Sequence, residues 1–124
     1  MRQLLKVNVF FTIEPETEHT PLKGNVLASG DDETDEAAEK EVQKQLETGN
    51  EWAWCCVKVT AVWHSTSGTE YSGTACLGCC SYESEKDFRG DYYTELQKEA
   101  LADLNTKLAT IRADLDELTD RETQ

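Results

Sequence analysis

The chain has 124 residues, of which 25 are acidic and 12 basic, giving a formal net charge of −13 at pH 7. This length predicts a single α+β domain over residues 1–124 and leaves no room for two ordinary domains. So negative a chain should not bind a nucleic-acid backbone or an anionic membrane surface directly, because both contacts need Lys and Arg. It suits a basic protein surface, although solubility alone would also account for the acidity.

The sequence carries no membrane or export signal. No apolar run approaches the roughly 20 residues that cross a bilayer, and the first residues lack the apolar centre of a signal peptide. We therefore expect a cytoplasmic protein that does not bind membranes. In a reducing cytosol its five cysteines should be free thiols.

The N-terminal segment alternates between apolar and polar residues. This alternation over residues 3–13 predicts a half-buried strand. The apolar face would consist of Leu5, Val7, Val9, Phe11 and Ile13. Pro15 and Pro21 should then break regular structure, and residues 25–28 could add a short strand.

An acidic helix is predicted next. Asp31 or Asp32 can cap its first N–H groups, and Gly49 should end it after Thr48. The apolar stripe is narrow, so most of the helix surface should lie in water. That stripe consists of Ala38, Val42 and Leu46.

Carboxylates dominate this segment. Residues 31–51 contain nine acids and two lysines, a balance of −7. A rigid helix can hold carboxylates in an array that mimics nucleic-acid phosphates, while a solvated face is the ordinary alternative. We predict that the early acids contact the basic partner; they are Asp31, Asp32, Glu33, Asp35, Glu36 and Glu39.

Residues 52–64 give the clearest strand signal. Their odd positions are all apolar, namely Ala53, Cys55, Val57, Val59, Ala61 and Trp63. A loop at 65–69 containing Gly68 should return the chain as a partner strand over 71–82. Trp52 and Trp54 fall on the other face, where they either pack under residues 14–30 or bind a partner.

The five cysteines gather on this hairpin. Pairing about the loop would place Cys55 opposite Cys79. Four thiolates are candidate zinc ligands, namely those of Cys55, Cys76, Cys79 and Cys80. Cys76 and Cys79 have the C-x-x-C spacing that is common in zinc sites. However, consecutive strand residues such as Cys55 and Cys56 point to opposite faces. We therefore favour small apolar side chains that fill a tight hairpin over a metal site.

Nothing in the sequence indicates catalysis. A catalytic cysteine needs a neighbouring base, and the two histidines, His19 and His64, lie away from the thiols along the chain. No phosphate-binding loop, Ser-His-Asp pattern or glycine-rich fingerprint is present. We predict a protein that is not an enzyme and uses no cofactor.

A short helix and a long one complete the chain. Ser84 and Asp87 resemble a capping box for one helical turn, which Gly90 would end. Asp91 would then cap a helix over about 91–121, roughly 45 Å long at 1.5 Å per residue. A small three-stranded sheet is narrower than that, so the far half of the helix should overhang it.

The long helix carries a coiled-coil pattern. Apolar residues spaced 3, 4, 3, 4 and 3 apart form its seam: Leu101, Leu104, Leu108, Ile111, Leu115 and Leu118. We predict that residues 96–104 dock on the sheet and that Leu108, Ile111, Leu115 and Leu118 join a homodimer. The alternative is a helix that packs only on its own sheet.

Flanking charges favour antiparallel pairing of such helices. A parallel pair would place Lys107 near Arg112 of the partner, whereas an antiparallel pair would place it near Asp114. Together the elements predict an α+β fold. It would have an antiparallel sheet of three to four strands, helices on one face and a long C-terminal helix.

Several stretches are distinctive together. They are GNEWAWCCVKVTA at 49–61, LGCCSY at 77–82, Tyr92-Tyr93 and ALADL at 100–104. Over about residues 24–108 the chain resembles small uncharacterised proteins of phages, plasmids and integrated elements. Small acidic proteins of such elements are often inhibitors of host defence. The resemblance therefore implies a context and gives no residue a role.

This context predicts an acidic protein-binding inhibitor of a bacterial defence complex, of the anti-CRISPR or anti-restriction type, in the host cytoplasm. Its partner would be a basic protein surface, for example that of a nucleic-acid-binding defence complex. Two alternatives stay open. One is a non-enzymatic adaptor or regulatory protein with an apolar interface, and the other is a small zinc-binding protein that uses the cysteine cluster.

Overall fold

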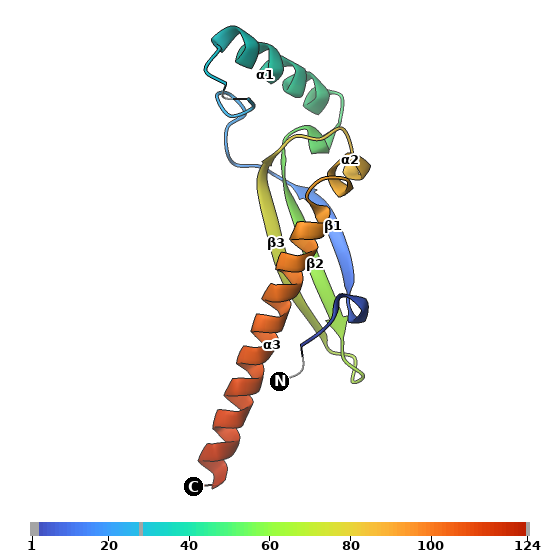
Figure 1. Ribbon diagram of the computed structural model, residues 1–124, viewed down its shortest axis with the longest axis vertical. Coiled ribbons are helices and arrows are strands. Elements are labelled where there is room, and N and C mark those ends of the chain that lie inside the picture. The colour runs from blue at the N-terminus through green and yellow to red at the C-terminus, as the bar shows by residue number, and fades with distance from the viewer. Residues whose placement is uncertain (1–2, 28, 124) are drawn as a thin grey trace. The chain divides into compact units, whose positions relative to one another are not determined.

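The computed structural model describes residues 3–27 and 29–123, and their side chains except those of residues 6 and 120–123. Within that part, the chain forms a three-stranded antiparallel sheet in the order β1-β2-β3 and three α-helices (Figure 1). The predicted α+β class and the long C-terminal helix are confirmed, with three strands in the sheet.

The strands are β1 (Phe10–Glu16), β2 (Cys55–His64) and β3 (Glu70–Cys80). The helices are α1 (Asp32–Glu47), α2 (Glu85–Arg89) and α3 (Tyr93–Thr123). Short 3-10 turns precede β1 and β2, at Lys6–Asn8 and Glu51–Ala53.

The chain divides into two compact units. Unit 1 comprises Met1–Thr12, Val59–Ala75 and Gln97–Gln124, and unit 2 comprises Ile13–Lys58 and Cys76–Leu96. Since the strands β2 and β3 contribute residues to both units, this division does not test the predicted single domain. That organisation stays a prediction.

The predicted strand over residues 3–13 is wrong in its first half, where a 3-10 turn stands instead. Asn8 donates its N–H to the Leu5 carbonyl at 2.9 Å, and its side-chain oxygen accepts the Leu5 N–H at 3.2 Å. Such local side-chain bonds compete with a strand ladder. Leu5 and Val7 are consequently 64% and 87% exposed, and β1 begins only at Phe10.

Pro15 does not end the strand as predicted, because it lies inside β1. This strand is at the edge of the sheet, where a missing N–H leaves the ladder to its neighbour intact. Phe11, Ile13 and Pro15 are half-buried between exposed neighbours, so the alternation continues through the proline. The suggested strand at 25–28 is not found at residues 25–27, where Asn25 closes a turn onto the Leu22 carbonyl, and residue 28 lies outside the described residues.

The hairpin of β2 and β3 follows the prediction closely. On β2 the side chains of Cys55, Val57, Val59 and Ala61 are at most 1% exposed. The Ser65 N–H binds the Thr69 carbonyl at 3.0 Å across the loop. The start of β2 is three residues later than predicted, because residues 51–53 form a 3-10 turn.

In unit 1, α3 packs against β3 at a glycine. A Cβ added to Gly73 would lie 2.5 Å from the Ala100 carbonyl oxygen, and it would also overlap the Leu104 backbone. Ala100 and Leu104 are 0% exposed, so this part of α3 is docked as predicted. Close approach of two backbones is a common reason for glycine within a strand.

Asp103 adds a polar clamp beside this contact. Its carboxylate accepts the Thr74 N–H at 2.8 Å and pairs with Lys107 at 3.0 Å. The Thr74 hydrogen bond, followed by the one from Lys107, lowers the pKa of Asp103. The clamp ties β3 to α3 by a charge-assisted bond.

Beyond Leu108 the surface of α3 is exposed. Every residue from 109 to 119 is exposed, including Ile111 at 42% and Leu115 and Leu118 at 55% each. Figure 1 shows α3 continuing past the loop that joins β2 and β3.

Unit 2 has an aromatic core around α2. Phe88 is 0% exposed, and its ring lies 5.1 Å from Tyr82, 5.8 Å from Trp52 and 6.4 Å from Tyr93. Ser84 caps α2 by accepting the Asp87 N–H, as predicted. Pairs of aromatic rings at these separations stabilise a core by more than the burial of their apolar surface alone.

The helix starts differ from prediction in detail. Asp31 stands at the N-cap of α1, but its carboxylate accepts the Thr34 hydroxyl at 2.7 Å and makes no capping bond. Asp91, expected to cap α3, accepts the Tyr82 hydroxyl at 2.7 Å. Gly49 ends α1 with a φ of +97°, as expected for a glycine after a helix.

Candidate protein-binding surfaces

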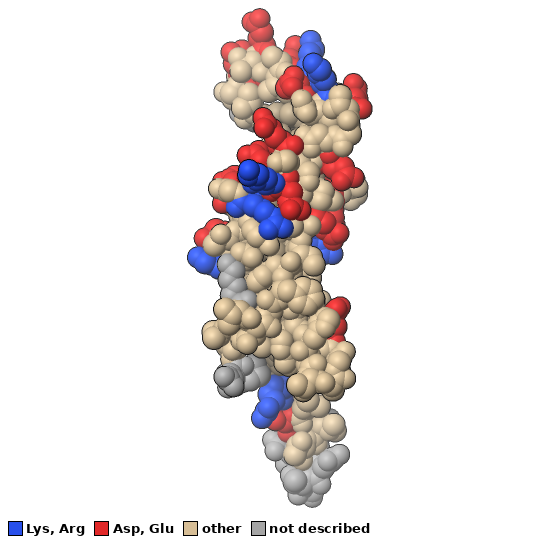
Figure 2. Space-filling view, turned by 90° about the vertical axis from the view of Figure 1, so that its right-hand side faces the viewer, with Lys and Arg blue, Asp and Glu red and all other residues tan. Residues whose placement is uncertain are grey.

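The negative charge is concentrated in one unit. Unit 2 has 17 acidic and six basic residues, a balance of −11, whereas unit 1 has eight and six, a balance of −2. On the face shown in Figure 2, carboxylates crowd over unit 2, while much of unit 1 is uncharged. The acidity is therefore local, which a general need for solubility would not require.

The six acids predicted to bind a partner fall into two groups. Three of them hold the chain around α1: Asp31 binds Thr34, Asp35 accepts the Ser29 hydroxyl at 2.7 Å, and Glu39 accepts the Gly24 N–H at 2.7 Å. The bonds from Ser29, first from its hydroxyl and then from its N–H, lower the pKa of Asp35. Asp35 and Glu39 fasten the segment before α1, and Asp31 binds a residue in the first turn of α1.

The other three acids are available to a partner. Asp32, Glu33 and Glu36 are exposed and form no ion pair or hydrogen bond with the residues that the structure describes. Asp32 and Glu33 each lie within one helical turn of Glu36, so the three share one end of α1. The sequence does not predict which acids are bonded and which are available, because this depends on the path of the loop that precedes α1.

Trp52 and Trp54 have contacts inside unit 2. The Trp54 indole donates to the Thr20 carbonyl at 3.0 Å, and Trp52 packs on Phe88. Both side chains are half-buried. These contacts favour the alternative in which the tryptophans pack within the chain, and their role in binding a partner stays a prediction.

Glu18 is a structural carboxylate that the sequence did not reveal. It accepts the Cys79 N–H at 2.6 Å and the Thr20 N–H at 2.9 Å. These bonds, the one from Cys79 being the stronger influence, lower the pKa of Glu18. The bond from Cys79 ties the loop after β1 to the end of β3. Both donors are backbone groups, so no pattern of side chains in the sequence predicts these bonds.

We predict that Glu18→Ala lowers the free energy of unfolding at pH 7 by about 1 kcal/mol, a value reduced for partial exposure of the pair. A carboxyl whose pKa is lowered by folding stabilises the fold above its unfolded pKa, near 4.5, and the benefit disappears as pH falls through the folded value. Urea unfolding at pH 7 and pH 3 should show the difference from wild type shrinking. Glu16→Ala, which removes the same charge and an exposed ion pair to Lys58, should have a smaller effect. A difference independent of pH would contradict this account.

The cysteines are divided between the inside and the outside of unit 2. Cys55 and Cys80 are 1% and 4% exposed, whereas Cys76 and Cys79 are exposed. The predicted opposition of Cys55 and Cys79 across the hairpin stays a prediction. Cys79 has a φ of +54°, and the inward-outward alternation of β3 shifts by one residue there, so that Cys80 is the buried residue.

Burial disfavours the thiolate form of the two inner cysteines. It raises the pKa of Cys55 to about 12 and that of Cys80 to about 11, and the neighbouring cysteines add to both shifts. Among residues 3–27 and 29–123, no group of three or more His, Cys, Asp or Glu side chains could hold a metal ion. Zinc binding by Cys55, Cys76, Cys79 and Cys80 stays an alternative to a role as small apolar side chains.

Three of the four residues predicted for dimerisation, Leu108, Ile111 and Leu115, line a groove in unit 1. Leu108 is half-buried, and Ile111, Leu115 and Leu118 are exposed on the same side of α3. The groove has a volume of about 480 Å³ and is lined by Gln3, Leu4, Asn8, Trp63, Leu108, Ile111, Arg112 and Leu115. The second wall of the groove is not predictable from the sequence, because Leu4 and Trp63 are remote from α3 along the chain.

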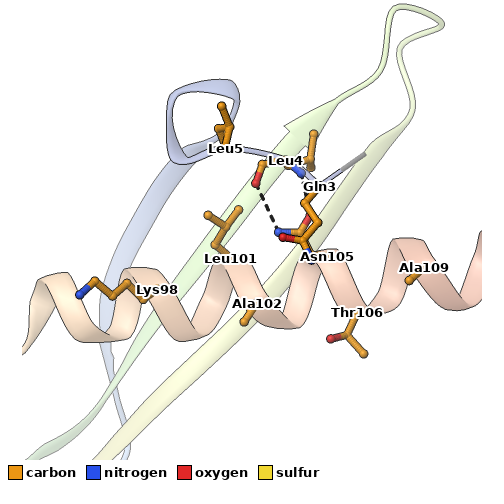
Figure 3. A pocket seen from close by; sticks show the side chains of 9 residues that line it. All are labelled: Gln3, Leu4, Leu5, Lys98, Leu101, Ala102, Asn105, Thr106 and Ala109. Atoms are coloured by element: carbon orange, nitrogen blue, oxygen red, sulfur yellow. Dashed lines mark hydrogen bonds between the residues drawn. The ribbon is translucent and has the colours of Figure 1, made fainter. Parts of the chain in front are cut away.

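Asn105 fixes that second wall against α3. Its side chain accepts the Leu4 N–H at 2.8 Å and donates to the Leu4 carbonyl at 3.3 Å, as Figure 3 shows. Figure 3 also shows Leu5 and Leu101 beside this clamp, where they line a neighbouring pocket. The paired bonds satisfy both the backbone N–H and the backbone carbonyl of Leu4, and they hold the N-terminal segment at the helix.

Comparison of the chain with protein-family models, curated proteins and solved structures found no match. The relation to proteins of phages and plasmids therefore stays a prediction. In the part of the chain that the structure describes, no helix is both long and apolar enough to span a bilayer.

In unit 1, His64 lies beside a carboxylate and an aromatic ring. Its Nε2 lies 3.1 Å from a Glu70 carboxylate oxygen, and its ring packs against Phe10 at 5.3 Å. This places it on the hairpin, with an exposed carboxylate as its partner. The prediction that the protein is not an enzyme remains a prediction.

Proposed function

We propose that this protein is a non-enzymatic, acidic inhibitor that binds the basic surface of a nucleic-acid-binding bacterial defence complex. The observation that supports this proposal is the segregation of charge, with a balance of −11 in unit 2 and −2 in unit 1. Like charges held close together destabilise a fold, so their concentration is better explained by a partner of opposite charge.

The exposed acids of α1 are the centre of the proposed contact. Asp32, Glu33 and Glu36 stand on a helix whose entry is held by the bonds of Asp35 and Glu39. A rigid scaffold loses little conformational freedom when its carboxylates are bound. Lys and Arg side chains that normally contact phosphates could pair with such an array, and the contact would weaken as salt rises.

An adaptor with an apolar interface is the second candidate. The exposed apolar residues Ile111, Leu115 and Leu118 favour it, since their contacts would be insensitive to salt. The same face supports a homodimer, which we propose as the working form of the inhibitor. Dimerisation would present two acidic units to the target.

The test begins with capture from the lysate of a bacterium that carries active defence systems. Tagged protein is loaded at low salt, eluted with a salt gradient, and its partners are identified by mass spectrometry. Capture of one nuclease or CRISPR complex at a defined salt step supports an inhibitor. Partners that resist high salt and do not bind nucleic acid would favour the adaptor.

Paired charge reversals then test the site. With the purified target, Glu33→Lys combined with Glu36→Lys should raise the dissociation constant at least tenfold, about 1.4 kcal/mol. Glu70→Lys combined with Glu99→Lys makes the same change of charge in unit 1 and should raise the dissociation constant less than about twofold, a loss of the size typical of exposed charges outside a contact. Equal losses from both pairs would show that only total charge matters, and no loss from the first pair would remove α1 from the interface.

A further inference from the structure

We infer that the groove beside Trp63 receives the exposed half of α3 from a second copy of this chain, running antiparallel. This inference rests on the proposed homodimer and adds a second wall to the binding site, formed by the N-terminal segment and Trp63. Instead of two bare helices in contact, each copy would insert its helix between the partner's α3 and the partner's N-terminal segment.

The groove has the chemistry of a helix-binding site. Its apolar surface comes from Leu4 and Trp63 on one side and from Leu108, Ile111 and Leu115 on the other. Polar side chains of Gln3, Asn8 and Arg112 border it. An apolar centre with a polar border is the usual composition of an interface between proteins.

Its walls are held in place before any partner arrives. Trp63 stacks on Tyr71 with ring centres 5.5 Å apart, and Asn105 binds both backbone groups of Leu4. A preformed groove costs a ligand less conformational entropy than one that must be ordered on binding. Aromatic side chains that are already half-buried are frequent anchors of binding energy.

The exposed side of α3 fits such a groove. Ile111, Leu115 and Leu118 project at spacings of four and three residues, the pattern with which one helix packs against another. In the described part of unit 1, α3 is the sole α-helix, so the complementary helix must come from outside the unit. A second copy supplies both groove and helix, as a two-fold symmetric interface requires.

Charge favours this occupant and this direction. Unit 1 has a balance of only −2, so two copies meet there with little repulsion. Antiparallel α3 helices place Lys107, which pairs with Asp103 of its own helix, near the partner's Asp114, and the two helix dipoles then run in opposite directions. Parallel helices would bring Lys107 toward the like charge of the partner's Arg112.

Two matched substitutions test the dimer. Analytical ultracentrifugation should find wild type as a dimer, and Leu115→Glu should raise its dissociation constant at least 100-fold. Ala113→Glu puts the same charge on the opposite side of α3, where the residue is also exposed, and should leave the constant within threefold. Since Leu115 is itself exposed, circular dichroism should show both variants folded. A wild type that stays monomeric at high concentration would overturn the dimer and this inference together.

A photo-crosslink tests the groove separately. A benzophenone amino acid replaces Leu118 in one copy, which is mixed with an isotopically labelled second copy and irradiated. Crosslinks from residue 118 to the labelled peptides that contain Leu4 or Trp63 are expected. Crosslinks confined to labelled α3 in a protein that still dimerises would leave the dimer standing and overturn the groove as its site.

Discussion

Gly73→Ala should lower the free energy of unfolding by about 3 kcal/mol or more, the upper range for overpacking a core. The added methyl group would lie 2.5 Å from the Ala100 carbonyl oxygen and closer still to the Leu104 backbone. Backbone atoms of a packed helix cannot rotate aside as a side chain would. Relief therefore requires α3 to move away from β3, which would also break the bond between Asp103 and Thr74.

Gly90→Ala is the matched control for this change. The nearest atom to a Cβ at Gly90 is the Asp87 carbonyl oxygen at 3.6 Å, an ordinary contact, and its φ of −78° is open to alanine. Urea unfolding followed by circular dichroism should show a change below about 1 kcal/mol for this variant. Similar losses from both variants would contradict the close approach of α3 to Gly73.

The elements whose structure follows from their local residue pattern are predicted well from the sequence. The strand β2 carries its burial pattern in alternate residues, and α1 ends at Gly49 because that residue takes a positive φ. The errors lie where a distant or local polar contact decides the outcome. Asn8, for example, turns the N-terminal segment into a 3-10 turn by accepting the Leu5 N–H.

The same division holds for the candidate surfaces. The acids of α1 and the seam on α3 were predicted because each follows the period of a single helix. Which acids are free was not predictable, since Asp35 and Glu39 bind a loop whose path the sequence does not fix. The groove was missed for a similar reason, because Trp63 and Leu4 reach α3 only through the fold.

Phe88→Ala should cost about 3–5 kcal/mol in the free energy of unfolding, the usual range for removing a buried aromatic ring. Phe88 is 0% exposed, and its ring contacts those of Trp52, Tyr82 and Tyr93. These neighbours come from three separate stretches of unit 2, so the surrounding structure can collapse only partly into the space left behind.

Phe10→Ala serves as the control for Phe88→Ala. Phe10 is 51% exposed and has one edge contact, to His64, so its loss should cost less than about 1 kcal/mol. Chemical denaturation monitored by fluorescence compares the two variants. Equal costs would contradict the placement of Phe88 at the centre of unit 2.

Hydrogen exchange on the Phe88→Ala variant tests the domain organisation as well. The strands β2 and β3 run through both units, so a single cooperative domain should lose amide protection in unit 1 and unit 2 alike. That result would support the single domain predicted from chain length. Loss confined to unit 2 would mean that the acidic unit opens by itself while unit 1, with its proposed dimer interface, stays folded.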